Sequence, residues 1–113
     1  MKIDTRTVRD VAIVSIIGRI PGETEKKQIQ EVLEGLLAGG TRKLVIDLSK
    51  TEWMSSAGLG ALIGTHQSYE DVGAQIMLAG LTSKIKELIV ITRLTEKFDI
   101  HDSVEEALTS FTV

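Results

Sequence analysis

The sequence predicts an α/β domain with the element order ββαβαβαβα. Short, β-branched apolar segments alternate along the chain with longer segments whose apolar residues recur at helical spacing. After an initial hairpin, this alternation indicates a mixed, mostly parallel sheet of about four or five strands. Each helical segment shows a single apolar stripe, so we expect the helices to pack on one side of the sheet. The length of 113 residues suits one domain, spanning residues 1–113.

The first two predicted strands form a hairpin. Residues 2–8 alternate weakly between polar and apolar, and Val11–Ile17 is β-branched and nearly all apolar. The segment from Gly18 to Gly22 breaks this pattern. A helix follows and ends at Gly39 and Gly40, and its apolar stripe consists of Ile29, Val32, Leu33, Leu36 and Leu37.

A second buried strand is predicted at Lys43–Leu48, and it leads through a polar loop to the next helix. We expect this strand and Val11–Ile17 to lie at the centre of the sheet. The residues expected to be least exposed are Val14, Ile16, Val45 and Ile46. The following helix ends near Gly73, and its inner stripe consists of Leu59, Leu62, Ile63 and His66.

The last third of the chain repeats the alternation of strand and helix. Ala74–Ala79 is a short apolar strand, and Thr82 is expected to cap a helix that buries Ile85, Leu88 and Ile89. A brief extended segment is predicted at Phe98–Ile100. Ser103 and Glu106 then have the spacing of a capping box, which predicts a final helix that buries Ala107, Leu108 and Phe111.

Composition narrows the class of function. The formal charge of −3 and the scattered lysines and arginines argue against nucleic-acid binding. Cysteine is absent and the two histidines are far apart, so we expect no thiol chemistry, metal or other cofactor. No apolar stretch approaches the roughly 18 residues of a membrane span, and no signal peptide is recognisable. We therefore expect a cytoplasmic protein, although membrane association through a partner stays open.

The most informative segment places two serines at the start of the second predicted helix. Ser55 and Ser56 follow the polar loop, and a phosphate at this point would meet unpaired backbone N–H groups and the positive end of the helix dipole. Gly58 and Gly60 each cost roughly 1 kcal/mol against alanine in a helix, which favours close approach of another molecule. The alternative is structural, with a serine as N-cap and glycines that let the helix pack on the sheet.

Enzyme classes fit this segment poorly. A serine hydrolase would need the G-x-S-x-G elbow, but Met54 occupies the position two residues before Ser56. His66 lies ten residues along the same helix, about 15 Å by helical rise, and cannot serve as a base for Ser56. A phosphate-binding G-x-x-x-x-G-K-[ST] loop is also absent. We therefore expect a protein without enzymatic activity.

The chain resembles STAS domains, and within them the bacterial anti-sigma factor antagonists. The resemblance rests on Val45–Leu48, on the motif Met54–Gly60 and on the order of elements along essentially the whole chain. It implies a domain that binds an anti-sigma factor, itself a serine kinase of the GHKL type, and thereby frees a sigma factor. Phosphorylation of the serine that matches Ser56 would abolish binding, and a serine phosphatase would restore it. Gly58 matches the glycine of the family motif.

Two departures from the family pattern concern this switch. Many antagonists carry an aspartate where this chain has Ser55, and another where it has Pro21. The rival interpretation is a STAS subunit that does not switch and that helps to assemble a membrane transporter ATPase or another signalling complex. Under either interpretation we expect a larger residue at Gly58 or Gly60 to weaken binding more than stability. The predicted partner surface consists of Arg19, Pro21, Trp53, Ser55, Ser56, Gly58 and Gly60.

Overall fold

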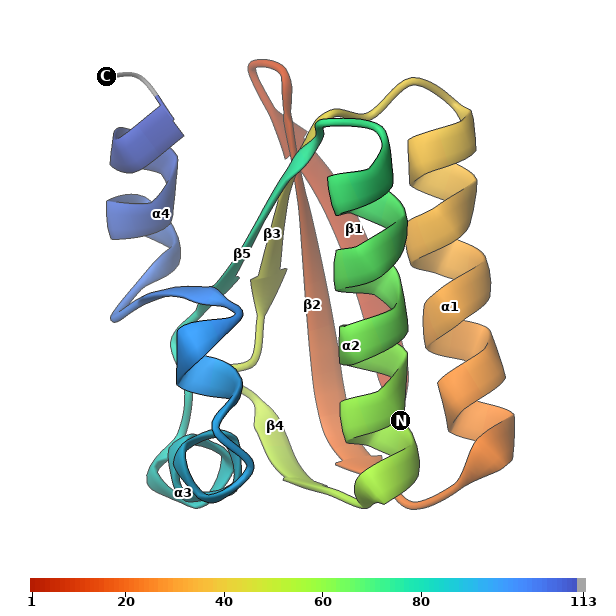
Figure 1. Cartoon of the computed structure of the whole chain (residues 1–113), viewed down its shortest axis with the longest axis vertical. Coiled ribbons are helices and arrows are strands. Elements are labelled where there is room, and N and C mark those ends of the chain that lie inside the picture. The colour runs from red at the N-terminus through yellow and green to blue at the C-terminus, as the bar shows by residue number, and fades with distance from the viewer. Residues whose placement is uncertain (112–113) are drawn as a thin grey trace.

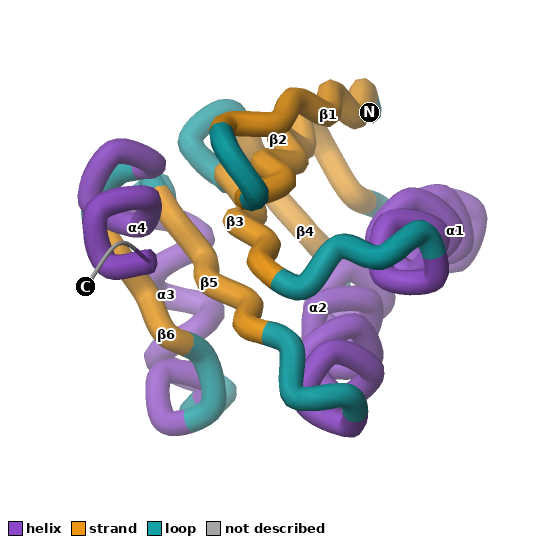
Figure 2. Tube along the Cα trace, turned by 90° about the horizontal axis from the view of Figure 1, so that it is seen from above, coloured by secondary structure: helices purple, strands orange, loops and turns teal. Residues whose placement is uncertain are grey.

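A computed structural model describes residues 1–111 as a mixed sheet with helices on both of its faces (Figures 1 and 2). Within residues 1–111, the sheet consists of six strands, and four α-helices and one 3-10 helix connect or follow them. The elements in chain order are β1 (Lys2–Val8), β2 (Val11–Ile20), α1 (Glu23–Ala38), β3 (Lys43–Asp47), β4 (Thr51–Met54), α2 (Ser56–Asp71), β5 (Gln75–Ala79), α3 (Ser83–Ile91), the 3-10 helix Leu94–Glu96, β6 (Asp99–His101) and α4 (Val104–Phe111).

The sheet has the strand order β1-β2-β3-β5-β6. β1 and β2 form the predicted antiparallel hairpin, and all other pairs are parallel. The central position of β2 and β3 is confirmed. The burial of the four residues predicted to be least exposed is also confirmed. None of them exposes more than 1% of its surface: Val14, Ile16, Val45 and Ile46.

One strand was not predicted. The polar loop expected before the two serines contains β4, which pairs in parallel with the end of β2, so the sheet has six strands and not four or five. Thr51 is fully buried, and its hydroxyl donates a hydrogen bond of 2.7 Å to the Ile16 carbonyl. Because this short strand contains Thr51 and Glu52, it lacks the apolar pattern by which a strand is recognised.

The prediction that all helices lie on one face is confirmed for α1, α2 and α3 and is wrong for α4. The first three helices pack on a cluster that includes Val14 and Ile46, whereas α4 packs on Ile13 and Val45 from the opposite face. Figure 2 shows α4 across the strands from α1 and α2. Successive residues of a strand point to opposite faces, so the continuous apolar runs of β2 and β3 require cover on both.

The helix starts follow the predicted capping residues. The Thr82 hydroxyl accepts a hydrogen bond from the Ile85 N–H, as expected. Ser103 accepts one from the Glu106 N–H, but the Glu106 carboxylate accepts from the Asp102 N–H, one residue before the donor of a regular capping box. The last strand covers Asp99–His101, a shift of one residue from the predicted segment.

Helices α1 and α2 lie side by side and run in the same direction (Figure 1). The fully buried Tyr69 of α2 donates a hydrogen bond of 2.7 Å to the Leu33 carbonyl of α1. Ser68 donates one of 2.8 Å to Glu34, at the edge of the same contact. Burial raises the pKa of Tyr69 to about 12, from its ordinary value of 10.0. These bonds fix the register of the two helices.

Replacing Tyr69 with phenylalanine should lower the free energy of unfolding by about 1 kcal/mol, because the hydrogen bond to α1 is lost. Because the folded-state pKa is raised, the stability contributed by the neutral phenol is complete below pH 10 and is lost as the pH rises toward 12. Urea unfolding of both proteins across this range should show a steeper alkaline decline for the wild type. Tyr69 is the only tyrosine, so phenolate absorbance reports its titration directly. A titration midpoint near 10 would contradict the prediction.

Candidate functional site

The candidate site lies where β2 and β4 end and α2 begins. Arg19 pairs with Trp53 and Ile20 with Met54 in the parallel ladder of these strands. The Ser55 N–H continues the ladder by donating to the Ile20 carbonyl at 2.9 Å. The short strand β4 therefore determines where the following helix starts.

The two serines at this point have different roles. Ser55 is the N-cap of α2, and its hydroxyl accepts a hydrogen bond of 3.2 Å from the Ala57 N–H. Ser56 is the first helical residue, it is exposed, and its hydroxyl bonds to no other residue of the described part of the chain. The structural interpretation of the serines therefore fits Ser55, whereas Ser56 presents an unengaged hydroxyl to solvent.

Gly58 faces the core and not the solvent. It is buried, and a Cβ atom there would lie 2.9 Å from Met54 Cβ and 3.0 Å from Ile20 Cγ2. Glycine thus allows the first turn of α2 to approach the ends of β2 and β4. This geometry contradicts the expectation that a larger residue at Gly58 would affect binding more than stability.

Gly60 lies one helical turn after Ser56, near the side chain of a residue in α1. A Cβ atom at Gly60 would lie 3.4 Å from the Lys26 ammonium nitrogen, which is the flexible end of a long side chain. Gly60 thus remains a candidate for the partner surface. Sequence analysis did not identify Lys26, because nothing in the sequence predicts which residue of α1 lies beside Gly60.

Arg19 and Trp53 are in contact at the ends of β2 and β4, shortly before the start of α2. The Arg19 guanidinium lies 5.0 Å from the centre of the Trp53 ring, in a cation–π arrangement. Pro21 is exposed and follows Ile20, whose carbonyl accepts from Ser55. The structure thus brings Arg19, Pro21, Trp53 and Ser56 to one end of the sheet. We call this group the α2-start surface.

The described residues contain no group of histidine and carboxylate side chains placed to hold a metal ion. His66 lies on the inner side of α2, with its ring 4.9 Å from that of Phe98 in an edge-to-face arrangement. Its Nδ1 lies 3.5 Å from a Glu70 carboxylate oxygen. His66 is therefore a packing residue, as its position in the predicted apolar stripe indicated.

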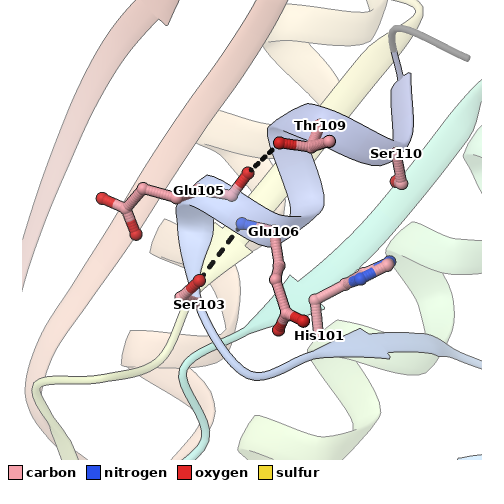
Figure 3. A pocket seen from close by; sticks show the side chains of 6 residues that line it. All are labelled: His101, Ser103, Glu105, Glu106, Thr109 and Ser110. Carbon is pink, nitrogen blue, oxygen red and sulfur yellow. Dashed lines mark hydrogen bonds between the residues drawn. The ribbon is translucent and has the colours of Figure 1, made fainter.

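Several of the polar side chains that line a hollow between β6 and α4 take part in local contacts of these two elements (Figure 3). Ser103 caps α4 by accepting from the Glu106 N–H, and Thr109 donates to the Glu105 carbonyl. The His101 Nε2 lies 3.2 Å from an Asp99 carboxylate oxygen. The hydrogen bonds drawn in Figure 3 hold the helix itself. The α2-start surface is therefore the stronger candidate.

Comparison with known proteins agrees with this arrangement of strands and helices. The model of the STAS domain family matches residues 2–107, which is nearly the whole chain. The chain belongs to the STAS domain family. None of the helices within residues 1–111 of this STAS domain combines the length and the apolar character of a membrane span.

Relatives of this STAS domain include anti-sigma factor antagonists. It is 26% identical over 105 residues to the anti-sigma-B factor antagonist of Staphylococcus epidermidis, covering 93% of this chain and 96% of the relative. Its fold matches an anti-sigma factor antagonist from Mycobacterium paratuberculosis with a TM-score of 0.87 and 23% identity, over 96% and 92% of the chains. It also matches the phosphorylated form of the Bacillus cell fate determinant SpoIIAA, with a TM-score of 0.77 and 15% identity, over 97% and 99%.

Replacing Gly58 with alanine should lower the free energy of unfolding by about 1–3 kcal/mol, because the new methyl group overlaps two buried side chains. Gly60→Ala is the matched control in the same helix. It should not lower stability, because alanine favours the helix and the Lys26 side chain can move. Urea unfolding measures both. Equal losses in the two variants would contradict the packing role of Gly58.

Proposed function

We propose that this STAS domain is an anti-sigma factor antagonist switched by phosphorylation of Ser56. With Ser56 unmodified, the α2-start surface binds an anti-sigma factor that is also a serine kinase, and the sigma factor is released. Phosphorylation ends this binding, and a phosphatase restores it. The observation that carries the proposal is the exposed, unengaged hydroxyl of Ser56 beside a neighbouring serine whose hydroxyl caps the helix. The antagonist relatives support the class of function.

The charge of a phosphate is sufficient for such a switch. Phosphorylation adds about −1.5 to −2 charges at neutral pH. A dianion held against a desolvated partner surface costs several kcal/mol even when one ammonium group pairs with it, and each roughly 1.4 kcal/mol reduces affinity tenfold. A loss of a hundredfold or more therefore requires no large conformational change.

The surroundings of Ser56 indicate that this serine is modified by another enzyme and does not act as a catalytic nucleophile. Activation of a serine requires a base within hydrogen-bonding distance of its hydroxyl. The Ser56 hydroxyl has no such contact within residues 1–111, and His66 is engaged with Phe98 and Glu70 elsewhere on the helix. We propose a regulatory domain without catalysis, acting in the cytoplasm.

Incubation with the cognate kinase and ATP should add one phosphate, on Ser56. Ser56→Ala should abolish labelling and leave partner binding largely intact, because the Ser56 hydroxyl holds nothing in the fold. Ser56→Asp should weaken binding by less than the phosphate does, since a carboxylate has less charge and fewer acceptor oxygens. Mass spectrometry and titration calorimetry measure these effects.

The matched control is Ser55→Ala. It should retain the label and lose about 0.5–2 kcal/mol of stability, because the N-cap bond to Ala57 is removed. A phosphate found on Ser55, or none with a kinase that acts on related domains, would overturn the proposal. Purification of the native partner then distinguishes the two candidate functions. A transporter ATPase in place of a kinase would indicate a STAS subunit that does not switch.

Trp53 is expected to be a principal contact of the partner. It is partly exposed, and its ring is held by Arg19, so little side-chain entropy is lost when a partner covers it. Trp53→Ala should weaken binding of the unphosphorylated protein by about 2 kcal/mol or more, roughly thirtyfold. Calorimetry with the cognate anti-sigma factor tests this. A loss below threefold would show that the partner binds elsewhere.

A further inference from the structure

Lys26 of α1 extends toward the helix that begins with Ser56. Its ammonium nitrogen would lie 3.4 Å, and its Cε 3.7 Å, from a Cβ atom built at Gly60. Because Gly60 has no side chain, the lysine can lie against α2. The Lys26 side chain is only partly exposed, whereas that of the adjacent Lys27 is exposed. Lys26 is therefore a partly buried lysine whose side chain lies against α2 near the candidate site.

The contacts between α1 and α2 repeat every four residues and show where Ser56 lies relative to Lys26. Gln30 Nε2 would lie 3.4 Å from a Cβ atom at Gly64, and Glu34 accepts a hydrogen bond from Ser68. The positions 60, 64 and 68 of α2 thus meet positions 26, 30 and 34 of α1. One step back along this stripe of α2 lies Ser56. Residues four apart on a helix are neighbours, with Cβ atoms about 5–6 Å apart.

A phosphate on Ser56 would therefore lie within reach of the Lys26 ammonium. The phosphate group extends the serine side chain beyond its hydroxyl, and the lysine ammonium sits at the end of a flexible chain of four carbons. Within residues 1–111, Lys26 takes part in no ion pair, so its charge is available. Two other charged side chains at this end of the molecule are already engaged. The Glu25 carboxylate accepts a hydrogen bond from the Gly22 N–H, and the Arg19 guanidinium lies over the Trp53 ring.

We propose that Lys26 is the counter-charge of phosphorylated Ser56. Pairing with the ammonium stabilises the dianionic phosphate and thus favours the phosphorylated form of the domain. The absence of carboxylates at positions 55 and 21 agrees with this role, since nothing at those positions repels the phosphate. This role of Lys26 rests on the proposed phosphorylation of Ser56, and it identifies the residue that pairs with the added phosphate.

The test uses the full chain with phosphoserine incorporated at position 56 during synthesis, so that no kinase is needed. The second pKa of the phosphate, ordinarily about 6, is measured by ³¹P NMR titration. In Lys26→Met this pKa should rise by about half a unit relative to the wild type. Lys27→Met is the matched control and should leave the phosphate pKa unchanged. Equal values for the wild type and Lys26→Met would overturn the inference.

Two further measurements separate a direct charge effect from a structural one. Lys26→Arg should retain the low phosphate pKa, because it keeps the positive charge. The difference between the wild type and Lys26→Met should shrink as salt is raised, since partly exposed charges are screened. Arg19, Glu23, Glu25 and Glu52 also lie at this end of the molecule and are unchanged in all variants. A failure of the kinase to label Ser56 would overturn the proposed function and leave this titration unaffected.

Discussion

The close approach of the first turn of α2 to the ends of β2 and β4 is the constraint on which the candidate site depends. A glycine at position 58 allows the helix backbone to contact Ile20 and Met54. The bond from Ser55 to the Ile20 carbonyl fixes the start of the helix at the same place. Since successive helical residues turn by about 100°, burial of Gly58 also determines that Ser56 points outward. The exposure of the Ser56 hydroxyl is thus a consequence of packing in the core.

The strands and helices of this fold were largely predictable, because the spacing of apolar residues in a long segment indicates whether it is a helix or a strand. The arrangement of the helices was less so. An apolar stripe shows which side of a helix is buried, but it does not show on which face of the sheet the helix packs. The apolar run Val11–Ile17 did contain this information, because it supplies both clusters of the core. The strand β4 could not be predicted, since its buried threonine is held by a hydrogen bond to a residue 35 positions away.

The candidate site was predicted in outline only. The pair of serines at a helix start was evident from the sequence. Close approach at Gly58 was also expected, but the structure shows that β2 and β4 make this approach, as in the structural alternative, and not another molecule. Which serine caps the helix depends on the exact end of β4, and therefore on a pairing between distant strands. The contacts of Arg19 with Trp53 and of Lys26 with Gly60 likewise join separate elements. No local pattern in the sequence reports such contacts.

The division of roles between the two serines explains how a charge can be added at a helix start without loss of the fold. If one hydroxyl both capped α2 and accepted the phosphate, modification would break the cap and cost about 1 kcal/mol. Here the cap bond belongs to Ser55, and Ser56 bonds to nothing that its modification would disturb. The helix dipole, worth about 0.3–1 kcal/mol at an exposed helix start, then favours the added charge. A phosphate on Ser56 would therefore act on the molecule that covers this residue and would leave the contacts that hold α2 in place.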